Sequence, residues 1–170
     1  TLVLLQLRTG SSWYSGTADA IRQNLFLLDR SRLPYALILS GDHVYRMDYA
    51  ALIRYHRERE AELTVACMPV PLPAAHAFGV VELDEDDRIR RFHEKPERPM
   101  AMPDDPNSAL ASMGIYVFDM GALCAALRCD DPAGASNHDF GRDIIPHLLE
   151  THRVYAYRFG GDRGRVTPDR

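Results

Sequence analysis

Strand-like and helix-like segments alternate along the chain, and this order constrains the fold more than any other feature of the sequence. Short apolar runs bounded by Pro, Gly or Asp predict strands, and segments with a 3.6-residue apolar period predict helices. The strands are expected at residues 2–7, 35–39, 63–70, 78–83, 88–92, 112–119 and 154–159, and the helices at 18–29, 48–59, 121–128 and from 140 onward. Such alternation predicts an α/β domain with a largely parallel sheet.

The run 35–39 is continuously apolar, as a central strand covered on both faces of a sheet should be. Ser40, Gly41, Asp42 and His43 follow it directly. Ligands of open α/β sheets bind beyond the carboxyl ends of the strands, so Asp42 could hold a hard cation such as Mg²⁺ there. A Gly-Asp pair after a strand is also common turn chemistry. The residues alone therefore leave a turn cap and a metal ligand equally open.

Composition narrows the class of protein. The chain has 170 residues, 46% of them hydrophobic and 26% charged, which is ordinary for one soluble globular domain. A net charge of −4 argues against a dedicated nucleic-acid binder. Three cysteines without zinc-like spacing favour a reducing cytoplasm, and no apolar run reaches the ~18 residues that a membrane span needs. Because the chain starts at Thr1 in a strand-like run and ends in a polar stretch, we expect an internal fragment.

The start of the first predicted helix is a candidate binding site. Gly16 precedes the helix, Thr17 can cap it, and Asp19 places a negative charge in its first turn. Unpaired N–H groups at a helix start attract anions or the polar edge of a base. An ordinary capped helix explains the same residues, so this signal is weak alone.

Glu94 and Lys95 follow the predicted hairpin, which has an acidic turn at residues 84–87. Lys95 is the only lysine among the 20 basic residues of the chain. A sequence this rich in arginine can keep lysine where a compact charge is needed, as on a phosphate. A chance surface lysine is the alternative.

Two further stretches carry polar groups. Ser112 begins a strand and could donate to a sugar hydroxyl, although a plain strand is the simpler interpretation. His138, Asp139 and Asp143 superficially resemble a metal cluster. A single histidine is more often structural, and capping of the helix that begins at Phe140 explains Asp139. We expect Pro146 to kink that helix.

Taken together and in this order, seven runs resemble bacterial ADP-glucose pyrophosphorylase, also called glucose-1-phosphate adenylyltransferase. The runs are WYSGTADAIRQNL, LILSGDHVYRMDY, TVACMPVP, AFGVVELDEDDRI, EKP, SMGIYVF and HDFGRDIIP, and they extend from about Trp13 to Pro146. The first and last runs favour this enzyme over thymidylyl-, uridylyl- and guanylyl-transferases. The resemblance implies a doubly wound, mostly parallel sheet of the nucleotidyltransferase type. It also implies conversion of ATP and α-D-glucose 1-phosphate to ADP-glucose and pyrophosphate, the first committed step of glycogen biosynthesis.

The resemblance also implies residue roles. Asp42 would hold Mg²⁺ and, with Lys95, serve catalysis, while Gly16 and Thr17 would lie against the nucleotide base. The residues implied to contact glucose 1-phosphate are Tyr14, Gly79, Glu94, Lys95 and Ser112. The family's Gly-rich triphosphate loop, its Trp-Arg-Asp-Val-Gly segment with a second metal-binding Asp, and its C-terminal β-helix domain are not in this sequence. Residues 1–170 are therefore expected to be part of a catalytic domain and inactive alone, and the full-length protein is expected to be an allosteric homotetramer.

Two alternatives remain at this point. One is a related nucleotidyltransferase with another base or sugar, against which the ordered runs argue. The other is a non-catalytic regulatory subunit or binding module of the same family. The presence of Asp42 and Lys95 argues against the second alternative, but residues outside this sequence bear on it too.

Overall fold

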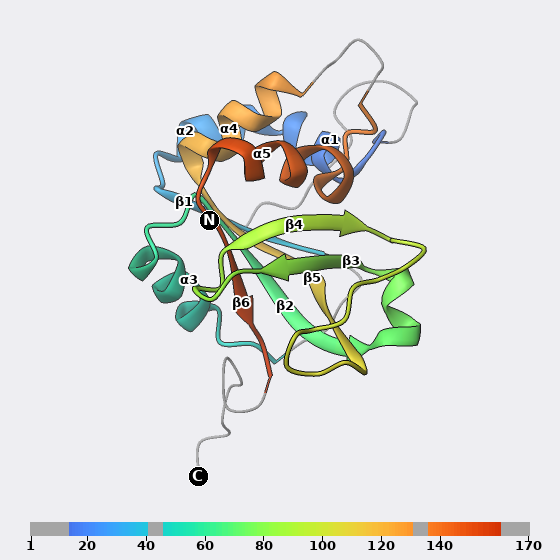
Figure 1. The fold of residues 1–170 in the computed structure, drawn as a ribbon. Coiled ribbons are helices and arrows are strands. Elements are labelled where there is room, and N and C mark those ends of the chain that lie inside the picture. The colour runs from blue at the N-terminus through green and yellow to red at the C-terminus, as the bar shows by residue number, and fades with distance from the viewer. Residues whose placement is uncertain (1–13, 41–45, 131–135, 161–170) are drawn as a thin grey trace.

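A computed structural model describes residues 14–40, 46–130 and 136–160, which form one six-stranded sheet with helices on both faces (Figure 1). The strands are β1 (Tyr35–Leu39), β2 (Leu63–Pro71), β3 (Gly79–Leu83), β4 (Ile89–Glu94), β5 (Ser108–Asp119) and β6 (Val154–Arg158). The helices are α1 (Thr17–Arg22), α2 (Leu25–Ser31), α3 (Tyr49–Glu58), α4 (Met120–Cys129) and α5 (Ile145–Thr151), with a 3₁₀-helix η1 (Leu72–Ala77) and a π-helical turn η2 (Phe140–Ile144). The predicted strand 2–7 lies outside the described residues.

The sheet has the strand order β4-β3-β5-β2-β6, and β1 pairs with the far half of β5. The predicted α/β class with helices on both faces is confirmed, but the sheet is mixed. β2 and β6 pair in parallel, whereas β5 runs antiparallel to β1, β2 and β3. The reason is that a loop without a helix leads from β4 to β5, so no βαβ crossover returns the chain in the parallel direction. β1, β2 and β6 still point the same way, which puts their carboxyl ends at one edge.

The predicted bounds of β1 are confirmed, whereas its central position stays a prediction, because the strand expected at residues 2–7 lies outside the described residues. Among the described strands β1 pairs only with β5, and its side chains are half-buried. Leu39, its last residue, is 46% exposed.

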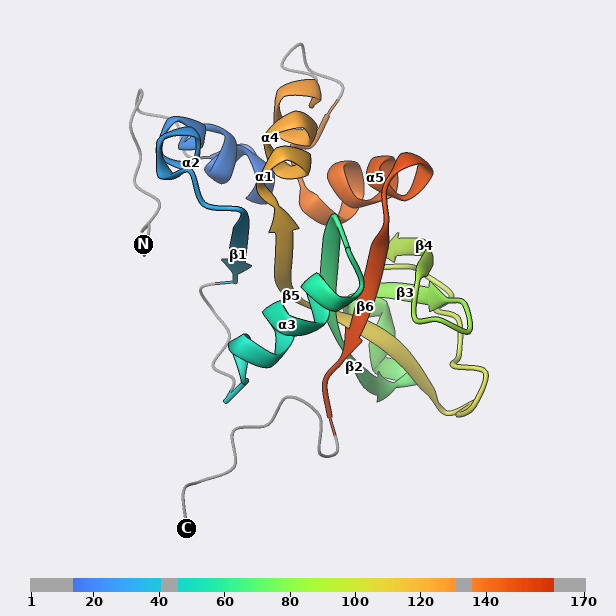
Figure 2. The ribbon, with the colours of Figure 1, turned by 90° about the vertical axis from the view of Figure 1, so that its left-hand side faces the viewer.

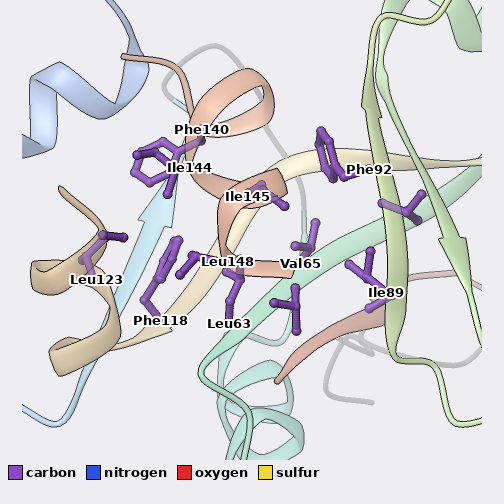
Figure 3. Packing of buried hydrophobic residues seen from close by; sticks show 14 of the residues in the cluster. Leu63, Val65, Ile89, Phe92, Phe118, Leu123, Phe140, Ile144, Ile145 and Leu148 are labelled. Carbon is purple, nitrogen blue, oxygen red and sulfur yellow. The ribbon is translucent and has the colours of Figure 1, made fainter. Parts of the chain in front are cut away.

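Two hydrophobic clusters cover the two faces of the sheet. On one face, α1, α4, η2 and α5 pack over β5, β2 and β4, and Figure 3 shows Phe118, Leu123, Phe140 and Ile145 among the contacts. On the other face α3 lies across β2, β5 and β6 and buries Leu52 (Figure 2). Helices thus fix both faces of the strands that carry the candidate site.

The predicted helix 18–29 is in fact two helices, α1 and α2. The break falls at Asn24, whose buried side chain donates to the Ala20 carbonyl at 2.9 Å. Asparagine competes in this way for backbone groups, which makes it unfavourable inside a helix. The apolar face that was predicted from Ile21, Leu25 and Leu28 does pack against the core.

The hairpin and the helix with Pro146 are confirmed. The Asp84 carboxylate accepts the backbone N–H groups of Asp86 and Arg88, which closes the acidic turn between β3 and β4. The last helical segment starts as η2 and continues as α5, with Pro146 in the first turn of α5. Proline has no N–H to donate, so a change of helix type just before it relieves the missing hydrogen bond.

Candidate functional site

The Glu94 side chain, at the end of β4, lies in a space that two glycines leave open. A Cβ atom added to Gly79 would lie 3.0 Å from Glu94 Oε2 and 2.5 Å from Phe92 Cζ. A Cβ atom added to Gly141 would overlap Glu94 Oε2 and lie 3.2 Å from Phe92 Cε1. Both glycines are therefore needed for the half-buried carboxylate to sit between β3 and η2.

Charged groups surround Glu94. Burial, and next the negative charge of Asp139, raise the pKa of the Glu94 carboxyl, while Lys95 and Arg142 act in the opposite direction. We call Gly79, Glu94, Lys95, Asp139, Gly141 and Arg142 the Glu94 cluster. A partly desolvated carboxylate with cations nearby can accept hydrogen bonds from a polar ligand, and carboxyls with raised pKa values cluster at functional sites.

Lys95 adopts a strained backbone conformation beside Glu94. Its φ of 47° is in the left-handed region, and its N–H donates to the Phe78 carbonyl at 3.0 Å. Non-glycine residues in this region cost free energy and cluster at binding sites. Within the described part of the chain the exposed Lys95 ammonium makes no ion pair within 4.0 Å. Among the described residues, the hairpin therefore ends in a cation without an ion-pair partner, next to a half-buried carboxylate.

Asp139 fixes the start of η2, as the sequence predicts. One carboxylate oxygen accepts the N–H groups of Gly141 at 2.9 Å and Arg142 at 3.1 Å. In return the Asp139 N–H donates to Asp143 at 3.0 Å. The His138 ring bonds Asp130 at 2.5 Å, which is a structural pairing. No group of three metal-ligating side chains is found in residues 14–40, 46–130 and 136–160.

The start of α1 lies against the segment that leads into η2. The N–H groups of Ala18 and Asp19 donate to the His138 carbonyl at 2.8 and 3.3 Å. A Cβ atom on Gly16 would overlap that same carbonyl oxygen. The prediction of unpaired N–H groups at this helix start is therefore wrong for these two, because a neighbouring loop satisfies them. Gly16, not Thr17, is the N-cap residue.

Thr17 instead caps the other helix. Its hydroxyl donates to Asp139 Oδ2 at 3.0 Å and accepts the Phe140 N–H at 3.1 Å. A nucleotide contact of Gly16 or Thr17 stays a prediction. Tyr14 lies half-buried just before α1, and its predicted sugar contact is likewise untested.

Ser112 lies in an irregular part of β5. The register between β2 and β5 shifts between Val65 and Cys67, and Gly114 opposite has a φ of 67°. Ser112 Oγ accepts the Gly114 N–H at 3.3 Å. Such bulges re-aim side chains and occur beside active sites, which is why a glycine with positive φ stands here.

Tyr116 is a residue that the sequence did not single out. Burial raises the pKa of its hydroxyl to about 12, with the charges of Glu94 and Asp139 adding to the rise and a hydrogen bond with Ser112 opposing it. Its ring lies 5.5 Å from that of Phe140. Tyr116 therefore links Ser112 to the Glu94 cluster. In the sequence, only Gly114, which interrupts the alternation of side chains along this strand, could have indicated that Tyr116 and Ser112 lie together.

Asp42, the predicted metal ligand, lies outside the described residues. The chain leading to it starts at Ser40, whose Cβ is 3.4 Å from where a Cβ on Gly114 would be. The Ser40–His43 stretch therefore begins beside the bulge that orients Ser112. The structure brings Gly16, Thr17, Gly79, Glu94, Lys95 and Ser112 into one connected neighbourhood.

A hollow in the described part of the molecule lies away from these residues. It measures about 700 Å³ and is lined by the hairpin turn, residues 100–104, Leu110 and Arg158. None of the predicted site residues lines it. Arg158, its main cation, already pairs with Asp87 at 2.7 Å. We therefore place the candidate site at the Glu94 cluster, because of the chemistry of its residues.

The mixed six-stranded sheet with flanking helices fits the α/β fold of a nucleotidyl transferase domain. The chain belongs to the nucleotidyl transferase family, whose model matches residues 3–163. It is 54% identical over 169 residues to a glucose-1-phosphate adenylyltransferase 2 of Vibrio parahaemolyticus. It is 51% identical to a glucose-1-phosphate adenylyltransferase of Methylococcus capsulatus over 154 residues and to one of Methylobacillus flagellatus over 158 residues.

These matches cover 99%, 91% and 93% of this chain, but only 42%, 36% and 37% of the relatives. The chain thus spans about two fifths of the length of the curated relatives it matches. No helix of the described residues is long and apolar enough to cross a membrane.

Proposed function

We propose that the protein containing this chain transfers an adenylyl group from ATP to α-D-glucose 1-phosphate, giving ADP-glucose and pyrophosphate. The observation that carries the proposal is the Glu94 cluster, where the half-buried Glu94 carboxylate fits against Gly79 and Gly141 and is close enough to Lys95 and Arg142 for both to lower its pKa. The names of the relatives support the choice of reaction. The same proposal places the enzyme in the cytoplasm, at the first committed step of glycogen biosynthesis, as an allosteric homotetramer.

The reaction needs positioning and charge neutralisation rather than a protein nucleophile. A phosphate oxygen of the sugar phosphate forms a bond to the α-phosphorus of ATP, and the bond from that phosphorus to the pyrophosphate oxygen breaks. Catalysis of such displacements comes from alignment and from cations near the developing charge. The residues of this chain are suited to hold the sugar phosphate.

Each residue of the site has a role in this proposal. Lys95, with Arg142 nearby, pairs with the phosphate of glucose 1-phosphate, since both are exposed cations beside Glu94. Glu94 accepts hydrogen bonds from sugar hydroxyls, which suits a partly desolvated carboxylate. Ser112 and Tyr116 line the sugar side with hydroxyl groups.

The nucleotide is proposed to lie toward the start of α1, with its base near Gly16 and Thr17. Mg²⁺ is proposed to be held by Asp42 together with a carboxylate from outside this chain, and it would neutralise phosphate charge. Carboxylate oxygen is the ligand type that Mg²⁺ prefers, so Asp42 fits chemically. The described residues neither add to nor oppose this assignment.

The test is an assay of the complete protein with Mg²⁺, glucose 1-phosphate and each nucleoside triphosphate in turn, measuring pyrophosphate and the sugar nucleotide. We expect ATP to be used far better than CTP, GTP, UTP or dTTP, and Asp42→Ala to abolish turnover. Equal use of another triphosphate would point to a related transferase. An inactive complete protein that still binds the ligands would point to a regulatory subunit. The isolated 170 residues should release no pyrophosphate, and ordinary turnover would contradict that expectation.

A further inference from the structure

The hydroxyl of Thr17 joins two segments that are far apart in sequence. It donates to Asp139 Oδ2 at 3.0 Å and accepts the Phe140 N–H at 3.1 Å, across more than 120 residues. The His138 carbonyl accepts the N–H groups of Ala18 and Asp19 beside it. Four hydrogen bonds therefore tie the start of α1 to the start of η2.

The far side of this connection is the Glu94 cluster. Each carboxylate oxygen of Asp139 bonds to a different segment. Oδ1 accepts the N–H groups of Gly141 and Arg142 in η2, and Oδ2 accepts the hydroxyl of Thr17 in α1. Gly141 sits directly against the Glu94 carboxylate, and Asp139 and Arg142 both influence its charge. A shift of the Asp139 side chain would thus move or re-orient groups that face Glu94.

We infer that Thr17 is a positioning residue for the sugar-phosphate side of the site, acting through Asp139 and η2. This inference rests on the proposed function, because it concerns affinity for glucose 1-phosphate. The base proposed near Thr17 would not depend on this hydroxyl, because the hydroxyl is already bonded to Asp139 and Phe140. A nucleotide contact made by the hydroxyl itself would predict that its loss weakens ATP binding, whereas the link to η2 predicts that its loss weakens binding of the sugar phosphate.

The test compares Thr17→Val, which keeps the shape and removes the hydroxyl, with Thr17→Ser, which keeps the hydroxyl. In the complete protein we expect Thr17→Val to raise the KM for glucose 1-phosphate about five- to tenfold, as expected for hydrogen bonds to a charged group at a partly exposed position. The KM for ATP should change less than twofold, and Thr17→Ser should restore the wild-type KM. Thr151→Val is the matched control, because Thr151 is exposed at the end of α5 and, within the described part of the chain, its hydroxyl bonds only to the neighbouring His152 ring.

Three results would overturn the inference in an active wild-type enzyme. They are an unchanged KM for glucose 1-phosphate in Thr17→Val, a rise confined to ATP, or no rescue by Thr17→Ser. A wild-type protein without the adenylyl transfer would instead refute the proposed function. Hydrogen exchange gives a second measurement that does not need the variant to be active. The Phe140 amide should exchange slowly in the wild-type protein, and fast exchange would contradict the link.

Discussion

Gly141→Ala should disturb the packing around Glu94 while the rest of the fold stays intact. The new methyl group would overlap Glu94 Oε2 and lie 3.0 Å from Glu94 Cδ and 3.2 Å from Phe92 Cε1. Ordinary contacts between carbon atoms are about 3.5–4.0 Å, so Glu94 Cδ has to move by roughly 0.5–1 Å and the overlapping Oε2 by more. A displacement of that size can lower activity up to about 100-fold. We expect kcat/KM for glucose 1-phosphate to fall about 10- to 100-fold, which corresponds to about 1.4–2.7 kcal/mol.

The assay is steady-state kinetics of the complete protein with each substrate varied in turn, together with urea unfolding. Overpacking of a tight site costs about 1–3 kcal/mol, so the protein should stay folded. Gly121→Ala is the matched control, because Gly121 is exposed in the first turn of α4 and an added Cβ would lie 3.1 Å from Asp119 Oδ1 rather than against the Glu94 cluster. Wild-type kcat/KM in Gly141→Ala would refute the reasoning that Glu94 is held in place by the absence of a side chain there.

Two further predictions concern buried charge. Glu94→Gln should lower kcat/KM at least about tenfold yet stabilise the protein at neutral pH, because the raised pKa means that the ionised carboxylate opposes folding there. In urea unfolding, the extra stability of the variant should vanish as the pH falls below the ordinary pKa range of glutamate. A variant less stable than the wild-type protein at neutral pH would contradict this. His56 is fully buried between Tyr35 and Thr64, and burial lowers its pKa from 6.5 to about 4, so the unfolded chain takes up a proton first as the pH falls. The wild-type protein should therefore lose up to about 3 kcal/mol of stability between pH 6.5 and pH 4, a loss that His56→Gln should remove and that parallel unfolding curves for the two proteins would disprove.

Much of the fold could be predicted because local sequence patterns determine the bounds of several helices and strands. The bounds of β1, α3 and the hairpin β3–β4 follow from apolar runs, from the Asp48 cap and from an acidic turn. The direction of β5 could not be predicted, because it depends on how the chain returns through a loop without a helix. The split at Asn24 was also missed, since it depends on one side-chain hydrogen bond to Ala20.

The candidate site was predictable only where the residue type itself carried information. Lys95 stood out by its rarity, and its neighbour Glu94 came with it. Tyr116 could not be found, because its proximity to Ser112 depends on the bulge at Gly114. Thr17 was interpreted as a cap of its own helix, whereas it caps η2, which lies more than 120 residues away in sequence. Such partners are set by tertiary packing and leave no local signal.

The central claim is that Lys95 and its neighbours bind the sugar phosphate, and kinetics of Lys95→Gln in the complete protein test it most directly. Loss of a charge-assisted contact to a phosphate costs about 2–3 kcal/mol, or about 30- to 150-fold. The account predicts a rise of that size in the KM for glucose 1-phosphate, with the KM for ATP and the melting temperature nearly unchanged. An unchanged KM for glucose 1-phosphate, or an equal rise for ATP, would contradict it.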